Sequence, residues 1–286
     1  MRKISLKIFA AFLILLCSLL FSCSNVNKNS SEDLTSLNAV KIHFIDVDQG
    51  DAILIQYKDK NMLIDSSTQK AEDKFLGYLK KQNIDEFDTV IATHPDEDHI
   101  GNMDLVIKNY TIKKFYAPKA TSTTKAFESM ITELKNKSLK INVLKAGSTI
   151  DFSNDVTLEV FAPNSDNYED SNNYSPIIKL TYGKNSALFT GDAEKLSEKE
   201  TLQKGYNLKS DILKVGHHGS STSTSKDFLK AVNPSIAVIS CGKNNKYGHP
   251  HKETITTLKN NNIQYYRTDT DGTIVLILDG TNIEKQ

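Results

Sequence analysis

The stretch Thr93-His94-Pro95-Asp96-Glu97-Asp98-His99-Ile100-Gly101-Asn102 decides the fold and the chemistry expected of this chain. It follows the apolar run 88–92, which is typical of a short buried strand, and it precedes residues 103–107, which predict the first turns of a helix. Two imidazoles and three carboxylates therefore lie at the carboxyl end of a strand, where open α/β sheets place their ligands. A polar loop with a helix cap would use similar residues, but the rest of the chain favours a pair of metal ions.

Six of the seven histidines fall in three tight clusters. The clusters are HPDEDH at 94–99, GHHGS at 216–220 and GHPH at 248–251, and each follows or closely trails a β-like run. Between the first two, residues 187–192 indicate a strand that ends in Asp192. Imidazole and carboxylate together suit zinc, manganese or iron, and carboxylate-rich sites favour the harder ions. The seventh histidine, His43, lies within an apolar strand and is expected in the core.

These motifs resemble the metallo-β-lactamase superfamily and, within it, the nuclease-like domain of the ComEC competence proteins for DNA uptake. The resemblance is carried by FIDVDQGD at 44–51, MLID at 62–65, HPDEDHIGN at 94–102, LFTGD at 188–192, LKVGHHGS at 213–220, GKNN at 242–245 and HP at 249–250. It covers about residues 40–280. It implies an α/β (α+β) fold, a four-layer αβ/βα sandwich of two mixed β-sheets with the site at one edge between the sheets.

Periodicity along the chain agrees with that architecture. Strands are predicted at 40–47, 52–57, 111–116, 156–161, 176–182, 186–190, 212–215, 235–239, 263–267 and 273–278. Helices are predicted at 70–81, 123–134, 193–203, 223–232 and 252–259, and the second of these could begin on Thr121 or Ser122. The strands come in two batches that are interleaved with helices, which suits two facing sheets with helices outside.

The resemblance implies two divalent metal ions, Zn²⁺ or Mn²⁺. In the superfamily the first motif usually reads His-x-His-x-Asp-His, and Asp96 replaces the second His here, as it does in the ComEC-like branch. The superfamily's lone His before the Gly-Asp strand is missing, and residues 172–175 offer asparagine and serine instead. One ion would then have His94, Asp96 and an Asn, and the other Asp98, His99 and His249, with Asp192 between them. The predicted metal ligands are His94, Asp96, Asp98, His99, Asp192 and His249.

The GHHGS pair occupies the place where phosphodiesterase relatives keep a non-ligand histidine near the leaving group. We expect His217 to be the acid or a ligand and His218 to be its neighbour, although motif order does not decide which of them acts. The predicted catalytic residues are His217, His218, Asp98 and Asp192, the two aspartates orienting the attacking water. The predicted substrate-binding residues are Ser220, Asn173 and Gly219. Three carboxylates near strand ends, Asp46, Asp51 and Asp65, either support the ligands through hydrogen bonds or are ordinary turn residues.

The N-terminus predicts export and lipid attachment. A basic start and an apolar run over 8–21, shorter than a membrane span, are typical of an export signal. Leu20-Phe21-Ser22-Cys23 resembles the bacterial lipoprotein processing site. We therefore expect a signal peptide over 1–22, lipid on Cys23, a flexible tether over 23–38 and a metallo-β-lactamase-like domain over 39–286. This would anchor the protein to the outer face of the bacterial cell membrane; an uncleaved membrane anchor is the alternative.

Charge and cysteine content narrow the function. The chain has 35 basic and 35 acidic residues, and removing 1–22 would leave 32 basic residues against 35 acidic ones. Nucleic-acid binding usually needs a basic patch, so any such patch here must be local. After Cys17 and Cys23, Cys241 is the remaining thiol, and it is expected to be a buried structural residue.

Three functions are compatible with these residues. The favoured one is metal-dependent hydrolysis of a phosphodiester, in DNA, RNA or a smaller molecule, by a metal-activated water. Hydrolysis of a carbon ester, thioester or lactam is the second, although those branches normally keep His where Asp96 stands. The third is a non-catalytic surface protein that binds a phosphorylated ligand.

Overall fold

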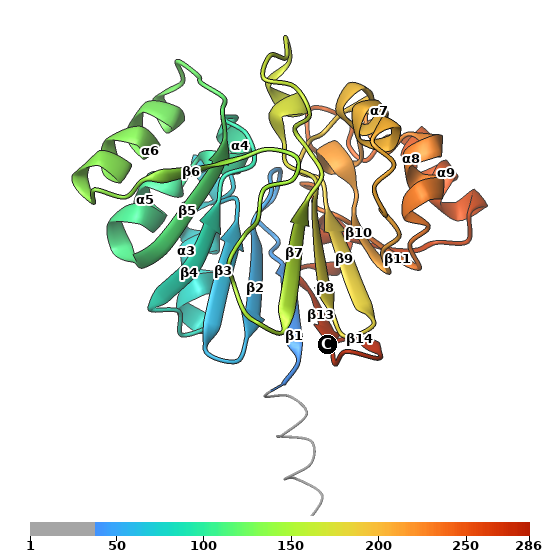
Figure 1. The fold of residues 1–286 in the computed structure, drawn as a ribbon, viewed down its shortest axis with the longest axis horizontal. Coiled ribbons are helices and arrows are strands. Elements are labelled where there is room, and N and C mark those ends of the chain that lie inside the picture. The colour runs from blue at the N-terminus through green and yellow to red at the C-terminus, as the bar shows by residue number, and fades with distance from the viewer. Residues whose placement is uncertain (1–37) are drawn as a thin grey trace, which may run out of the picture. The chain divides into compact units, whose positions relative to one another are not determined.

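Two β-sheets face each other, and helices cover the outer side of each, as Figure 1 shows. The computed structural model describes residues 38–286, of which Ala39–Gln286 form one compact unit. The predicted four-layer sandwich is confirmed. The signal peptide, Cys23 and nearly all of the tether lie outside the described residues. Within residues 38–286, no helix combines the length and the apolar character that crossing a membrane requires.

The first sheet has eight strands in the order β14 (Ile283–Lys285), β13 (Ile274–Leu278), β1 (Val40–Phe44), β2 (Ile53–Tyr57), β3 (Lys60–Ile64), β4 (Glu86–Ile91), β5 (Thr111–Pro118) and β6 (Ile141–Leu144). The second has six, in the order β12 (Gln264–Arg267), β11 (Ile236–Ile239), β10 (Ile212–Lys214), β9 (Asn185–Phe189), β8 (Ile178–Tyr182) and β7 (Val156–Val160). Strands β3 to β6 run parallel, as do β9 to β12, and the remaining pairs are antiparallel.

The α-helices are α3 (Glu72–Lys81), α4 (Glu97–Ile100), α5 (Met103–Asn109), α6 (Lys125–Asn136), α7 (Lys195–Gln203), α8 (Lys226–Val232), α9 (Lys252–Asn260) and α10 (Thr268–Asp271). Short 3-10 helices are η1 (Gln69–Ala71), η2 (Ser171–Tyr174) and η3 (Gly216–Gly219). Helix α6 begins later than Thr121 or Ser122, because the Thr124 hydroxyl accepts the Phe127 amide and caps the helix.

Alternating side chains build three apolar layers. On β2, Ile53 and Ile55 pack between the two sheets, whereas Leu54 packs against the helices outside the first sheet. On the second sheet, Leu188 and Leu213 face the other helix layer. Burying each such side chain contributes about 1.5–3 kcal/mol. Because both faces of the central strands are covered, their sequences are apolar almost throughout, as expected of parallel strands in α/β folds.

The strands that the sequence did not predict lie mostly at the edges. Strand β6 pairs on one side with β5, and its Val143 side chain is 54% exposed. Strand β14 at the opposite edge is short and polar. Edge strands bury little surface, so their sequences carry little of the apolar pattern that predicts a strand.

Candidate metal centre

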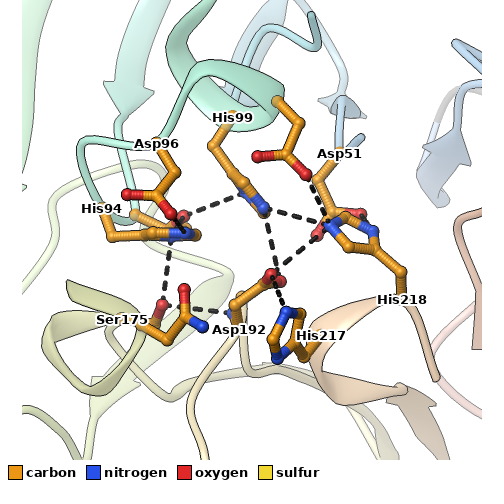
Figure 2. Close-up of polar contacts among 12 residues, drawn as sticks. Asp51, His94, Asp96, His99, Ser175, Asp192, His217 and His218 are labelled. Atoms are coloured by element: carbon orange, nitrogen blue, oxygen red, sulfur yellow. Dashed lines mark hydrogen bonds and ion pairs between the residues drawn. The ribbon is translucent and has the colours of Figure 1, made fainter. Parts of the chain in front are cut away.

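Loops from the carboxyl ends of β4, β9, β10 and β11 converge on one polar cavity of about 130 Å³. Its lining residues are Gln49, Asp96, Asp98, Asn172, Asp192, His217, His218, Tyr247 and His249. Figure 2 shows the side chains that meet at its base. Parallel strands in both sheets place their loops here, so motifs from distant parts of the sequence come together.

The loop from β4 to α4 delivers the first motif. Asp96 precedes α4 but makes no capping hydrogen bond, and instead its Oδ1 accepts the Ser171 hydroxyl at 2.8 Å. Its other oxygen, Oδ2, lies 3.9 Å from His94 Nε2. The geometry therefore excludes the helix-cap explanation for this carboxylate. The first turn of α4 carries His99, which is fully buried, and Asp98, which borders the cavity.

The Asp192 carboxylate occupies the centre of the cluster, at the turn after β9 (Figure 2). Its Oδ1 lies 3.3 Å from His99 Nε2, and its Oδ2 lies 3.4 Å from His218 Nε2 and 3.6 Å from His217 Nε2. His218 Nε2 is also 3.3 Å from Asp98 Oδ2. One buried carboxylate thus lies within ion-pair distance of three imidazoles.

Hydrogen bonds on the far side of two rings set which nitrogen faces the cavity. His99 Nδ1 donates to Asp65 Oδ2 at 2.7 Å, and His218 Nδ1 donates to the Ser240 carbonyl oxygen at 3.0 Å. Each neutral ring then presents its Nε2 lone pair to the cluster, which is the arrangement that metal-binding histidines use. Asp65 also accepts the Thr93 amide and hydroxyl at 2.8 and 2.7 Å. Of the two explanations offered for Asp65, the geometry favours the supporting role.

The donor set fits divalent cations. Among the described residues, four groups of three side chains have potential ligand atoms within 4.8 Å of one another: His94–His99–Asp192, Asp98–His99–His218, Asp51–Asp192–His218 and Asp51–Asp65–His99. In the described part of the chain, His94 Nε2 and Asp192 Oδ1 are buried without a partner in hydrogen-bond geometry, although Asp192 Oδ1 lies 3.3 Å from His99 Nε2. Buried polar atoms are rarely left in that state, and a cation would satisfy both. The mixed nitrogen and oxygen donors suit Zn²⁺ or Mn²⁺.

The ionisation of the cluster agrees with a cation site. Burial lowers the pKa of His94 to about 3, so its ring is neutral and has a nitrogen lone pair available for a cation. Burial also disfavours charge on His218, but Asp192 and Asp98 outweigh it and raise the pKa of His218 to about 10. His99 behaves alike, because Asp192 and Asp65 raise its pKa well above the usual value despite burial. Without metal, protons on these two rings balance the carboxylates that a cation would otherwise neutralise.

His217 lies nearer to solvent than His218. Its side chain is 23% exposed, its Nδ1 lies 3.2 Å from the Thr222 hydroxyl and 3.4 Å from Glu194 Oε1, and its Nε2 points towards Asp192. Both histidines of η3 have φ near +50°, in the left-handed region. Such conformations cost about 1–3 kcal/mol each and gather at functional sites.

Sequence reasoning assigned these histidines incompletely. His218, predicted as the neighbour of the acting residue, belongs to two of the candidate ligand groups, and it takes the place beside Asp98 and His99 where His249 was predicted. His249 lies at the rim, with its ring centroid 5.4 Å from that of His217 and its Nδ1 buried without a partner in the described chain. Its role as a ligand stays a prediction.

The predicted substrate-binding residues Asn173, Ser220 and Gly219 are not among the residues that line the metal cavity, and their role stays a prediction. Asn173 is buried, and its Oδ1 accepts the Ser197 amide, whereas Asn172 lines the cavity. Ser220 is buried and its hydroxyl bonds the Thr222 hydroxyl. At Gly219 a Cβ would lie 2.5 Å from Pro250 Cβ, so this glycine permits close packing against Pro250. When two residues are adjacent in the sequence, their positions alone do not show which of the two side chains points into the cavity.

Two supporting residues were missed or left undecided. Lys214, at the end of β10, is fully buried, and its ammonium group pairs with Asp51 Oδ2 at 2.8 Å. Asp51 Oδ1 lies 3.6 Å from His218 Nδ1. The sequence feature that could have indicated this role is a lysine at the end of an apolar strand, directly before a histidine motif. Two other predictions hold, since His43 and Cys241 are buried.

Two facing mixed sheets, outer helices and a buried His/Asp cluster define a metal-dependent hydrolase fold. The chain belongs to the metallo-β-lactamase superfamily, whose family model matches residues 45–243. The fold is similar to that of the metallo-β-lactamase fold protein YhfI from Bacillus subtilis, with a TM-score of 0.56, 14% identity, and coverage of 84% of this chain and 99% of that one.

Curated relatives are consistent with the ComEC-like branch. ComE operon protein 3 of Bacillus subtilis (strain 168) is 31% identical over 82% of this chain and 32% of its own length. Competence protein ComA of Neisseria gonorrhoeae is 27% identical over 83% of this chain and 32% of its own length. The chain therefore spans about a third of the length of these relatives.

Proposed function

We propose that this protein is a metal-dependent phosphodiesterase that hydrolyses DNA, RNA or a smaller phosphodiester. The observation that carries the proposal is the Asp192 carboxylate, which lies among three imidazoles at the base of a cavity that opens to solvent. The carboxylate Asp96 beside His94 makes the centre richer in oxygen than those of the lactam-hydrolysing branches. Similarity to a competence protein supports a phosphodiester substrate.

The residues divide into binding and proton-transfer roles. Metal ions held here would polarise a phosphoryl oxygen and lower the pKa of a water molecule. His94 and Asp96 would hold one ion, and Asp98, His99 and His218 the other, with Asp192 between them. These donors lie on strand ends and on α4, so their positions are set by the packed core.

His217 is the side chain best placed to supply a proton. Its ring lies at the mouth of the cavity, and its Nδ1 lies 3.4 Å from Glu194 Oε1. A proton held at Nε2 can then pass to the oxygen of the leaving group. Asp98, whose pKa His218 and His99 hold well below its usual value in spite of burial, stays ionised and can orient the attacking water.

The test is a substrate panel with one matched variant. Chelator-treated protein, reloaded with Zn²⁺ or Mn²⁺, is assayed on single-stranded DNA, RNA, a nitrophenyl phosphodiester and a β-lactam. We expect phosphodiester hydrolysis that disappears with chelator and in Asp192→Asn, a variant of the same size. Turnover of the lactam alone, or of none of these substrates by fully metal-loaded protein, would refute the proposal.

We also propose that lipid on Cys23 holds the protein at the outer face of the membrane. The support is the Leu20-Phe21-Ser22-Cys23 sequence after an apolar run. Native protein should partition into detergent with lipid on Cys23, and Cys23→Ser should release it or stall its processing. Native protein in the medium with an unmodified Cys23 at its start would rule this out.

A further inference from the structure

An aromatic side chain lies beside the metal centre without a role in it. Tyr247 is 51% exposed and lines the metal cavity. It also lines a larger outer cavity of about 630 Å³, and the two cavities share Gln49, Asp96 and Asp98 as well. They are therefore adjacent, and Tyr247 borders both the small polar space and the larger one. The outer volume lies in the range that accommodates small organic ligands.

The Tyr247 ring is held in a defined position. It stacks on the His249 ring, with centroids 5.6 Å apart and an angle of 22° between the planes. The Asn245 amide orders the loop, because its Oδ1 accepts the Tyr247 and His249 amides and its Nδ2 donates to the Gly242 carbonyl oxygen. An exposed ring fixed in this way loses little conformational entropy when a second ring stacks on it.

Two lysines of the outer cavity are available to a phosphate-bearing ligand. Lys70 and Lys246 are exposed there, and in the described chain neither forms an ion pair; Lys246 Nζ lies 4.9 Å from the centre of the Tyr247 ring. An exposed cation–π contact is worth only about 0.5–1 kcal/mol, so a stacked base can displace it.

The acidic side chains of the outer cavity already have partners. Asp48 pairs with Lys74, Glu97 accepts the Gln69 amide, Asp96 accepts the Ser171 hydroxyl and Asp98 pairs with His218. Lys74 and His218 offset the charges of Asp48 and Asp98, whereas the groups that donate to Glu97 and Asp96 are neutral. Lys70 and Lys246 are the basic side chains of the outer cavity that are available to a phosphate.

We propose that Tyr247 stacks against the nucleobase next to the scissile phosphate, so that the substrate is single-stranded nucleic acid. The inference rests on the proposed phosphodiesterase function and specifies its substrate class. The small cavity then receives the phosphate, the outer cavity the base and sugar, and Lys246 and Lys70 the neighbouring phosphates. Bases in a duplex are stacked on each other and unavailable to such a ring, whereas single strands bind through base–aromatic stacking.

The decisive experiment compares a single-stranded oligodeoxynucleotide with the same backbone carrying abasic residues. Tyr247→Leu should lower kcat/KM on the normal strand by about fivefold to a hundredfold, the usual range for one stacked base. Tyr247→Leu should leave kcat/KM on the abasic strand nearly unchanged, and Tyr247→Phe should behave like wild type on both strands. Val143→Ala, a change at a similarly exposed side chain outside both cavities, is the control.

A binding readout separates this inference from the catalytic proposal. Quenching of 2-aminopurine fluorescence in a labelled single strand should occur with wild type and Tyr247→Phe but not with Tyr247→Leu. If quenching depends on Tyr247 but no phosphodiester is cleaved, the stacking site stands and the proposed catalysis fails. If Tyr247→Leu loses nothing, or loses equally on normal and abasic strands, the stacking inference is overturned, since an equal loss means that the ring acts only through His249.

Discussion

Replacing Asp65 by asparagine tests how the metal centre is held together. The Asp65 side chain is fully buried; Oδ1 accepts the Thr93 amide at 2.8 Å, and Oδ2 accepts His99 Nδ1 at 2.7 Å. Asparagine has the same shape but only one acceptor oxygen. If that oxygen keeps the Thr93 amide, an NH₂ group faces His99 Nδ1, and the ring must move its proton to Nε2. The lone pair that faces the cluster is then lost.

The expected loss is a 10- to 100-fold weaker metal affinity, about 1.4–2.7 kcal/mol, as is usual when the partner of a metal-binding histidine is changed. Competition titration of chelated protein with Zn²⁺ measures it, with circular dichroism to verify folding. Asp73→Asn, on the exposed face of α3, is the control. A folded Asp65→Asn protein with wild-type affinity would refute the claim that Asp65 sets the orientation and tautomer of His99.

Three further outcomes are expected. His218→Ala should lose metal, whereas His217→Ala should keep metal and lose about a hundredfold or more in turnover. The loss of turnover in His217→Ala should be smaller for a substrate with a nitrophenyl leaving group. Equal loss of metal in the two variants would place His217 among the ligands. Lys214→Met should cost about 3–5 kcal/mol in urea unfolding because it removes the ammonium partner of the buried Asp51 carboxylate, and adding Asp51→Asn should recover part of this loss. An unchanged unfolding midpoint in Lys214→Met would contradict this. Because the pKa of His218 is raised to about 10, the protonated ring contributes fully to the stability of the metal-free protein below about pH 6.5, and this contribution is lost as the pH rises through about 10. Metal binding at pH 7 should therefore release protons, which calorimetry in buffers of different ionisation enthalpy would detect. A release of zero protons would contradict this.

Sequence reasoning succeeded where the signal is local. The HPDEDH motif directly follows a buried strand, so His94, Asp96 and His99 could be placed at a strand end before the fold was known. The Gly-Asp turn placed Asp192 in the same way. The two-sheet architecture was implied by the resemblance to the metallo-β-lactamase superfamily, and the apolar runs interleaved with helical spacing agreed with it, because both faces of the central strands are buried.

The remaining errors arise where orientation depends on contacts distant in sequence. His217 and His218 are adjacent and share left-handed backbone angles, and contacts with Ser240, Asp98 and Asp192, all distant in sequence, show that His218 points inward. Asn173 was predicted to bind substrate, and its buried orientation likewise depends on a distant contact, since its Oδ1 accepts the amide of Ser197 on α7. The Lys214–Asp51 pair joins the two sheets across the core, which residue spacing cannot reveal.

The most direct test of the account measures metal content and phosphodiesterase activity together in wild type and Asp192→Asn. Protein purified gently without chelator should contain at least one tightly bound transition metal. After chelation, activity on a phosphodiester should return in proportion to added Zn²⁺ or Mn²⁺ in wild type, and Asp192→Asn should bind less metal and stay inactive. Protein that holds no metal and regains no activity on reconstitution, or an Asp192→Asn variant as active as wild type, would contradict the assignment of this cluster as a catalytic metal centre.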